Sequence, residues 1–160
     1  MMLPGFDDDV PLHPVGVYVI GSLRNPQVPV VGNAIRAAGF EAFEDWYGGG
    51  EFADDHWQRY EQARGRSYVD ALQGYLAQNT FNLDHRHLRR CDAAVLVAPT
   101  GKSGHLELGF AVGLGKPVYY LLDGEPERWD VMLNFCYVNG GAVCTSLDEV
   151  LDRLAVFNVA

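Results

Sequence analysis

The segment 93–98 is an unbroken run of small and branched apolar residues, with Asp92 before it and Pro99 after it. A strand of this kind has no polar face to offer to water, so both of its faces must be covered by other parts of the chain. A parallel sheet between two layers of helices provides that cover. The run therefore predicts a central strand of an α/β fold.

The rest of the chain alternates between segments typical of strands and segments typical of helices. Short apolar segments that predict the other strands lie at residues 15–21, 40–43, 116–122 and 141–145. Helices are predicted between them, at residues 25–38, at 79–90, from Ser103 and from Ser146. This alternation predicts an α/β fold with a flavodoxin-like, doubly wound, five-stranded parallel sheet and helices on both faces. In such folds, ligands bind beyond the carboxyl ends of the strands.

The length of 160 residues suits a single domain with one hydrophobic core. Residues 1–14, which include three prolines and three consecutive aspartates, are expected to form an N-terminal tail, and residues 15–160 are expected to form the domain. Residues 45–78 are too long for an ordinary connection between a strand and a helix. We therefore expect a helical insertion there, which would form a lid or a wall.

The charge of the chain limits the classes of partner. A formal net charge of −9 argues against a nucleic-acid polymer, because such partners require clustered lysine and arginine. No apolar stretch approaches the roughly 20 residues that span a bilayer, and the start of the chain lacks the features of a signal peptide. We expect a cytoplasmic protein with no membrane partner that acts on a small molecule. The three cysteines lack paired spacing and are expected to be reduced core residues.

Glu107 is the most informative candidate for chemistry. Its helix is expected to follow a loop at 99–102 and to start with Ser103 as the N-cap. Phe110 and Ala111 lie three and four residues beyond Glu107, which predicts that the carboxylate shares the face that packs on the sheet. Its place near the helix N-terminus is expected to help keep it ionised.

Asp84 lies on the apolar side of its predicted helix, since Leu88 and Cys91 follow it by four and seven residues. Partial burial there is expected to hold Asp84 protonated. If Asp84 and Glu107 reach one cleft, they can serve as general acid and nucleophile, as in retaining glycoside cleavage. Each acid also has a structural interpretation: a favourable helix-dipole contact for Asp84 and a capping interaction for Glu107.

An aromatic segment follows the second predicted strand. It begins with Asp45 and Trp46 and continues through Tyr47, Trp57 and Tyr60. Planar side chains of this kind stack on nucleobases, and they also pack insertions or subunit contacts. The histidines form no recognised ligand motif, so no metal and no cofactor are expected.

Three ordered blocks of the sequence, within residues 16–135, resemble the nucleoside 2-deoxyribosyltransferase family, which includes the related 2′-deoxynucleoside 5′-monophosphate N-glycosidases. The first block is Tyr18-Val-Ile-Gly-Ser22-Leu-Arg24-Asn25. The second is Asp84 ahead of Cys91-Asp92-Ala-Ala-Val, and the third is Gly104-His-Leu-Glu107-Leu-Gly-Phe-Ala111 followed by Gly115-Lys-Pro. Three blocks in the family's order make a more specific signal than any one of them.

The resemblance implies cleavage of the N-glycosidic bond of 2-deoxyribonucleosides or their 5′-monophosphates. By position, Glu107 would be the nucleophile at C1′ of the sugar, Tyr18 the phenol that orients it, and Asp84 the acid at the departing base. Asn134 resembles the asparagine that family members lend to a neighbouring subunit, which implies a homo-oligomer, a dimer or higher. The alternative for Asn134 is a loop side chain that satisfies backbone groups.

The related N-glycosidases imply the remaining substrate contacts. Gly21, Ser22 and Arg24 match their phosphate loop, and Ser103 and Gly104 lie near the place of a second serine at a helix start. Both serines also suit helix capping. Transferases of the family commonly carry an aspartate where residues 99–103 have no acid, so transfer of the sugar to a base and to water both stay open. A non-catalytic nucleotide-binding or sensing module and an FMN-binding module are the other interpretations.

Overall fold

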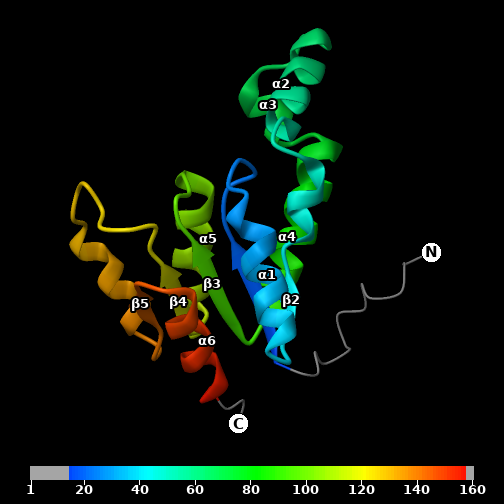
Figure 1. The fold of residues 1–160 in the computed structure, drawn as a ribbon. Coiled ribbons are helices and arrows are strands. Elements are labelled where there is room, and N and C mark those ends of the chain that lie inside the picture. Colours follow the sequence, from blue (N-terminus) through cyan, green and yellow to red (C-terminus); the bar gives the residue numbers. More distant parts are fainter. Residues whose placement is uncertain (1–14, 158–160) are drawn as a thin grey trace.

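The computed structural model describes residues 15–157, which form a parallel five-stranded sheet between helices (Figure 1). The strands are β1 Gly16–Ile20, β2 Glu41–Phe43, β3 Ala93–Val97, β4 Val118–Leu121 and β5 Ala142–Cys144. Their order in the sheet is β2-β1-β3-β4-β5, which is the order of flavodoxin-like folds. The predicted fold class is therefore confirmed. The tail expected at residues 1–14 lies outside the described residues.

Helices cover both faces of the sheet. Helices α1 Gln27–Ala37 and α6 Leu147–Ala155 pack on one face, and α4 Tyr75–Arg90 and α5 Lys102–Gly113 pack on the other. The strands supply both cores, because successive side chains point to opposite faces. In β1, for example, Val17 and Val19 belong to the core under α1 and α6, whereas Tyr18 faces α4 and α5.

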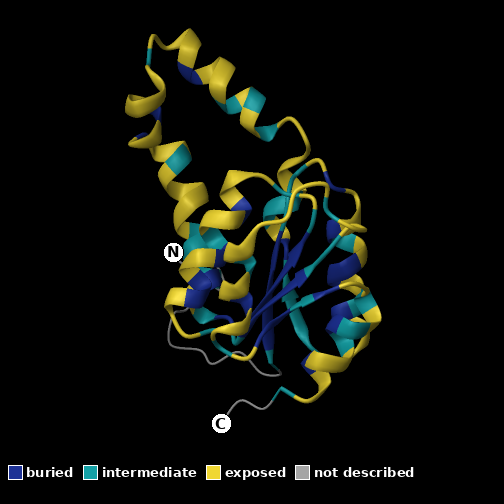
Figure 2. Ribbon diagram, turned by 90° about the vertical axis from the view of Figure 1, so that its left-hand side faces the viewer, coloured by how far each residue is buried: buried dark blue, intermediate teal, exposed yellow. Residues whose placement is uncertain are grey.

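The connection between β2 and α4 is helical. It contains the short 3₁₀ helix η1 Asp45–Gly49, then α2 Ala53–Ala63 and α3 Tyr68–Leu72. We call α2 and α3 together the helical arm; it projects beyond the carboxyl ends of the strands and away from the sheet (Figures 1 and 2). Within the arm, which the structure describes in full, only Glu61 and Ala71 are buried. Helix α4 begins four residues earlier than the sequence predicts, at Tyr75.

The start of α5 differs from the prediction. The helix begins at Lys102 after Gly101, and no described side chain caps it, so Ser103 is not the N-cap. Ser103 instead lies inside the first turn of α5, where it is exposed. Gly104 packs closely on the preceding loop: a Cβ there would lie 2.6 Å from Oγ1 of Thr100 and 3.2 Å from Ile20.

The crevice between β1 and β3 is the topological switch point of the sheet, because the chain leaves these strands toward opposite faces. Asn25 ties its two sides together and is 6% exposed. Its Nδ2 donates to the carbonyl of Val97 at 3.3 Å, and its Oδ1 accepts from the backbone N–H of Gln27 at 3.0 Å. The loops after β1 and β3 are thereby held side by side.

Candidate active site

Tyr18, Asp84 and Glu107 come together between β1, α4 and α5. The charges of Glu107 and Asp84 both act on the Tyr18 phenol, so the three groups lie within electrostatic reach of one another. Tyr18 Oη, Asp84 Oδ1 and Glu107 Oε2 are all buried, and no described group makes a hydrogen bond to any of them. Three buried polar atoms without partners in one place are unusual in a folded protein. We call these residues the carboxylate cluster.

Burial controls the proton affinity of the cluster. It raises the pKa of Glu107 to about 7; the Tyr18 hydroxyl opposes this rise as a donor, and the charge of Asp84 adds to it. The Tyr18 and Glu107 groups are close enough for that effect, although they do not complete a hydrogen bond. Burial also raises the pKa of Asp84 to about 6, in the direction that the sequence predicts.

The expectation that the helix N-terminus keeps Glu107 ionised is not met, because burial dominates its pKa. The helix dipole acts mainly within the first turn. Glu107 lies five residues after Lys102, beyond that turn. Both carboxyl groups therefore titrate near neutral pH.

Aromatic rings border the cluster. The ring of Phe43 lies 5.4 Å from that of Tyr18 and stacks on His87 at 3.8 Å. On the outer side, His85 bridges α4 and α5: it stacks on Phe81 at 5.2 Å and contacts Phe110 at 5.1 Å. The raised pKa values of Glu107 and Asp84 come mainly from burial, which disfavours the charged form of each carboxyl group.

A pocket of about 500 Å³ opens at the switch point. Its lining includes three residues from the loop after β1 and two from the loop after β3, together with Asp123, which follows β4; the loop residues are Ser22, Arg24, Asn25, Thr100 and Gly101. Ser22 Oγ accepts the backbone N–H of Arg24 at 3.1 Å, which shapes the first loop. The guanidinium of Arg24 is exposed and pairs with Asp55 of α2 at 3.4 Å. This ion pair connects the switch point to the arm.

Two predicted substrate contacts, Gly21 and Trp46, lie together at the end of β1. The indole N–H of Trp46 donates to the carbonyl of Val19 at 3.0 Å. A Cβ at Gly21 would lie 2.6 Å from Val28 and 3.6 Å from the Trp46 ring, so this position has no room for a side chain. Trp46 thus forms a half-buried wall beside the switch point.

The other predicted contacts lie farther apart. Asp45 is exposed at the start of η1, close enough to raise the pKa of His87, whose overall shift is downward because of burial. Ser103 is exposed at the start of α5, whereas Gly104 is buried against Thr100. Asn134 is exposed on the 3₁₀ helix η2 Val131–Tyr137, where its Nδ2 donates to the carbonyl of Val131 at 2.8 Å. Within one chain, the residues of the carboxylate cluster lie together, and so do those of the two switch-point loops. Among the described residues, the Asn134 side chain makes a hydrogen bond only within its own helix.

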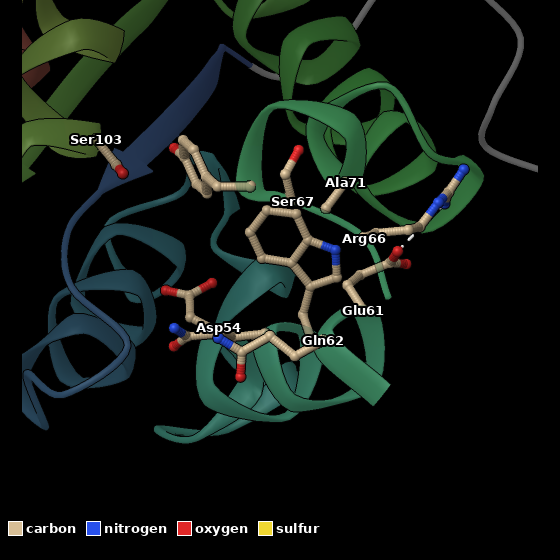
Figure 3. Close-up of a pocket in the computed structure, with 10 residues that line it drawn as sticks. Asp54, Glu61, Gln62, Arg66, Ser67, Ala71 and Ser103 are labelled. Carbon is tan, nitrogen blue, oxygen red and sulfur yellow. Dashed lines mark hydrogen bonds and ion pairs between the residues drawn. The ribbon is translucent and has the colours of Figure 1, made fainter. Parts of the chain in front are cut away.

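A second pocket, of about 490 Å³, lies between the arm and α5 (Figure 3). We call it the arm pocket. Residues of α2 and α3 form most of its lining, and Ser103 of α5 lies across from them. Sequence patterns did not indicate Gln58, Gln62 and Tyr68 as lining residues, because exposed polar and aromatic residues on short helices follow no periodic pattern.

Comparison with known proteins supports the fold. The structure is similar to a 2-deoxyribosyltransferase from Bacillus psychrosaccharolyticus, with a TM-score of 0.55 and 17% sequence identity over 86% of this chain and 91% of that chain. A CMP N-glycosidase from Clostridium botulinum, BcmB, aligns with a TM-score of 0.49 and 15% identity over 88% of this chain and 99% of that chain. The sequence matches no protein-family profile and no curated protein. The likeness to the transferase shows a shared fold.

The described residues bear on two further expectations. Across 15–157, no group of three or more histidine, cysteine, aspartate or glutamate side chains is arranged to hold a metal ion. Within the same range, each helix is too short or too polar to cross a lipid bilayer. All three cysteines, Cys91, Cys136 and Cys144, are buried and free, as predicted.

Proposed function

We propose that this protein cleaves the N-glycosidic bond of (2-deoxy)ribonucleosides or their 5′-monophosphates through a covalent glycosyl ester on Glu107. The observation that carries the proposal is the carboxylate cluster: two carboxyl groups and a phenol, buried together without described partners, on a fold shared with a 2-deoxyribosyltransferase. Buried titratable groups with shifted pKa values are typical of active sites. The resemblance of the three sequence blocks assigns the same residues.

Two displacements at one carbon describe the chemistry. An oxygen of Glu107 attacks C1′ of the sugar, and the bond from C1′ to the base nitrogen breaks as the new ester bond forms. Asp84 gives its proton to the departing base. In the second step, water or another base attacks C1′, the ester bond to Glu107 breaks, and Asp84 accepts the proton of the incoming group. The configuration at C1′ is retained.

Tyr18 would act as a positioning residue for the nucleophile. Its side chain is buried, and its hydroxyl is close enough to the Glu107 carboxylate to influence its charge. A donor at that place favours the ionised form of Glu107. It therefore increases the fraction of protein in which the nucleophile is ready to react.

The switch-point pocket is the proposed place for the 5′ end of the sugar. Ser22 and Arg24 line it, and they supply a hydroxyl and a guanidinium to a phosphate or a 5′-hydroxyl group. Trp46 and Gly21 form the wall beside it. In this arrangement the sugar lies across the carboxyl end of β1, which is where ligands bind in open α/β sheets.

A second copy of the chain is the proposed partner of the outer face of α5. Helix α5 carries apolar residues on its outer side as well as on the side that packs on the sheet: Leu106 is 75% exposed, and Leu114, which follows the helix, is 47% exposed. Gly109 and Gly113 have no neighbour within 4 Å of an added Cβ, so another helix can approach closely there. The neighbouring helix η2, which carries Asn134, extends the apolar face. Burial of this face would bring Asn134 to the boundary between two subunits.

The proposal is tested by incubating a panel of nucleosides and 5′-monophosphates with the protein, with and without an added free base, and separating the products by chromatography. We expect base release, exchange of bases, or both, and loss of at least a thousandfold in rate for Glu107→Gln and for Glu107→Ala. Glu125→Gln, in an exposed loop, is the control. A Glu107→Ala protein that cleaves at the rate of the parent would falsify the proposal. Tight binding without base release would favour a non-catalytic nucleotide-binding module.

A further inference from the structure

The arm pocket has the size and the lining of a small-molecule site. Its volume of about 490 Å³ falls within the range of ligand pockets, which is roughly 300–1,000 Å³. Aromatic rings, carboxamides and charged groups all contribute to the lining. This mixture suits a planar, polar ring better than an aliphatic chain, because such a ring offers both faces for stacking and edges for hydrogen bonds.

We propose that the arm pocket holds the heterocyclic base of the substrate, with Trp57 and Tyr68 as its stacking surfaces. This inference rests on the proposed N-glycosidic cleavage and names the part of the protein that selects the base. It assigns to the helical arm a substrate-binding role that the carboxylate cluster and the switch point do not fill.

The two aromatic residues are arranged to receive a flat ring. Trp57 of α2 and Tyr68 of α3 stand edge to face, with ring centres 6.2 Å apart and planes at 61°. Tyr68 is 70% exposed, so much of its ring remains open for contact. Gln58 and Gln62 lie on the same lining, and their carboxamides both donate and accept hydrogen bonds, as the edge of a base requires.

One end of the pocket is fixed in advance by a buried charge. Glu61, which is 3% exposed, forms ion pairs with Arg66 at 3.2 Å and with Arg64 at 3.5 Å. Ser67 begins α3 and accepts the N–H of Asp70 at 3.2 Å. These contacts join the end of α2 to the start of α3, so the residues between the two aromatic rings are held in place.

One polar group inside the arm lacks a hydrogen-bond partner among the described residues. The indole Nε1 of Trp57 is buried, and no described group accepts its hydrogen. Unpartnered buried donors are rare and costly in folded proteins. An acceptor on a bound ring would satisfy this donor after a small shift of the indole, which makes Trp57 the residue whose environment should respond most to a ligand.

The pocket also lies in the right place for the proposed chemistry. Ser103, on the wall opposite the arm, precedes Glu107 by four residues in α5. Residues four apart lie one turn apart on the same side of a helix. A ring held between the arm and Ser103 would therefore lie near the helical turn that carries the nucleophile (Figure 3).

Isothermal calorimetry with adenine, cytosine and their deoxynucleosides tests the proposal in the Glu107→Gln background, where no turnover consumes the ligand. Stacking on one aromatic ring contributes enough that we expect at least tenfold weaker binding for Trp57→Leu and for Tyr68→Leu. Trp57→Phe, which keeps a ring but removes the N–H, should weaken binding less. Tyr75→Leu, an 88% exposed aromatic residue at the start of α4, is the matched control and should bind as the parent does.

Unchanged binding in Trp57→Leu and Tyr68→Leu, equal weakening in Tyr75→Leu, or no binding of any probe at millimolar concentration would each overturn the proposal. Circular dichroism of every variant verifies that the helices are retained. The two proposals fail separately: base release that survives Glu107→Gln refutes the chemistry alone, whereas unchanged binding in the arm variants refutes the base site alone.

Discussion

The carboxyl groups of Glu107 and Asp84 enter the same buried space from α5 and α4, and burial raises the pKa of both. The pKa of Glu107 is raised to about 7, and that of Asp84 to about 6. The proposed mechanism requires an ionised Glu107 beside a protonated Asp84. Because the two groups titrate in the same pH range, this form is only a fraction of the free protein, and the rate should depend strongly on pH.

A bell-shaped pH profile of kcat/KM is the first prediction. Activity should rise as Glu107 ionises toward pH 7 and fall as Asp84 loses its proton above pH 6, which places the optimum between about 6 and 7. Because the two carboxyl groups interact, the two apparent pKa values of the profile describe the pair and not either residue alone. Rates of base release from pH 4.5 to 9 measure the profile. In Asp84→Asn the alkaline limb should disappear, and its persistence would show that Asp84 is not the acid.

A gain in stability on replacing the nucleophile is the second prediction. The folded pKa of Glu107, about 7, lies above its ordinary value of 4.5, so the folded state binds more protons than the unfolded state between these values. Stability is therefore lost as pH rises from 4.5 to 7, and the full cost is present above pH 7. Glu107→Gln, which carries no charge, should be more stable than the parent by about 2–3 kcal/mol at pH 8 and by little at pH 4.

Urea unfolding at the two pH values measures this difference in the absence of any substrate. Glu125→Gln, at an exposed position, should show no gain at either pH. Equal stability of Glu107→Gln and the parent at pH 8 would mean that burial of the ionised Glu107 carboxylate does not destabilise the folded protein.

The third prediction concerns Tyr18, whose hydroxyl lowers the pKa of Glu107. Tyr18→Phe should move the acid limb of the pH profile to higher pH and reduce activity at pH 6 by about tenfold or more. The free energy of unfolding should change by less than about 1 kcal/mol, because the hydroxyl that is removed is buried without a described partner. An acid limb that stays in place would assign Tyr18 a packing role alone. Tyr75→Phe, at an 88% exposed position at the start of α4, is the control.

The sequence predicted the sheet and the inward position of Glu107 because both follow from apolar patterns. The run at 93–98 has no polar face, and residues 93–97 lie fully buried as β3. Ala111 follows Glu107 by four residues and is completely buried, which brings the carboxylate to the edge of the sheet. Phe110, which was expected on the same face, is 37% exposed and contacts His85 of α4, because the outer side of α5 also carries apolar residues and the pattern does not separate the two sides.

Other features depend on packing that no local pattern encodes. The start of α5 at Lys102 comes with a close approach of Gly104 to Thr100 in the loop after β3, which no local pattern indicates. The raised pKa values of Glu107 and Asp84 depend on the burial of each group in the fold. The burial of Glu61 in the arm could not be predicted either. Its partners Arg64 and Arg66 lie close to it in the chain, and alternating charges of this kind are also typical of exposed helix surfaces.

The fourth prediction tests the proposed contact between two copies of the chain. A charge at Leu106, which is 75% exposed at the outer face of α5, would be buried without a partner in the assembly. Leu106→Glu should therefore shift the protein from dimer or higher to monomer at micromolar concentration, as measured by light scattering after size-exclusion chromatography. Val156→Glu, at a 77% exposed position after α6 on the opposite face of the sheet, should leave the mass unchanged. A parent protein that is monomeric at high concentration, or a Leu106→Glu protein with the mass of the parent, would show that this face is not the interface.

The same variant tests the role of Asn134, which lies on the neighbouring η2. If the Asn134 amide serves a second subunit, dissociation should also lower base release. A purely structural asparagine would leave the rate per chain unchanged.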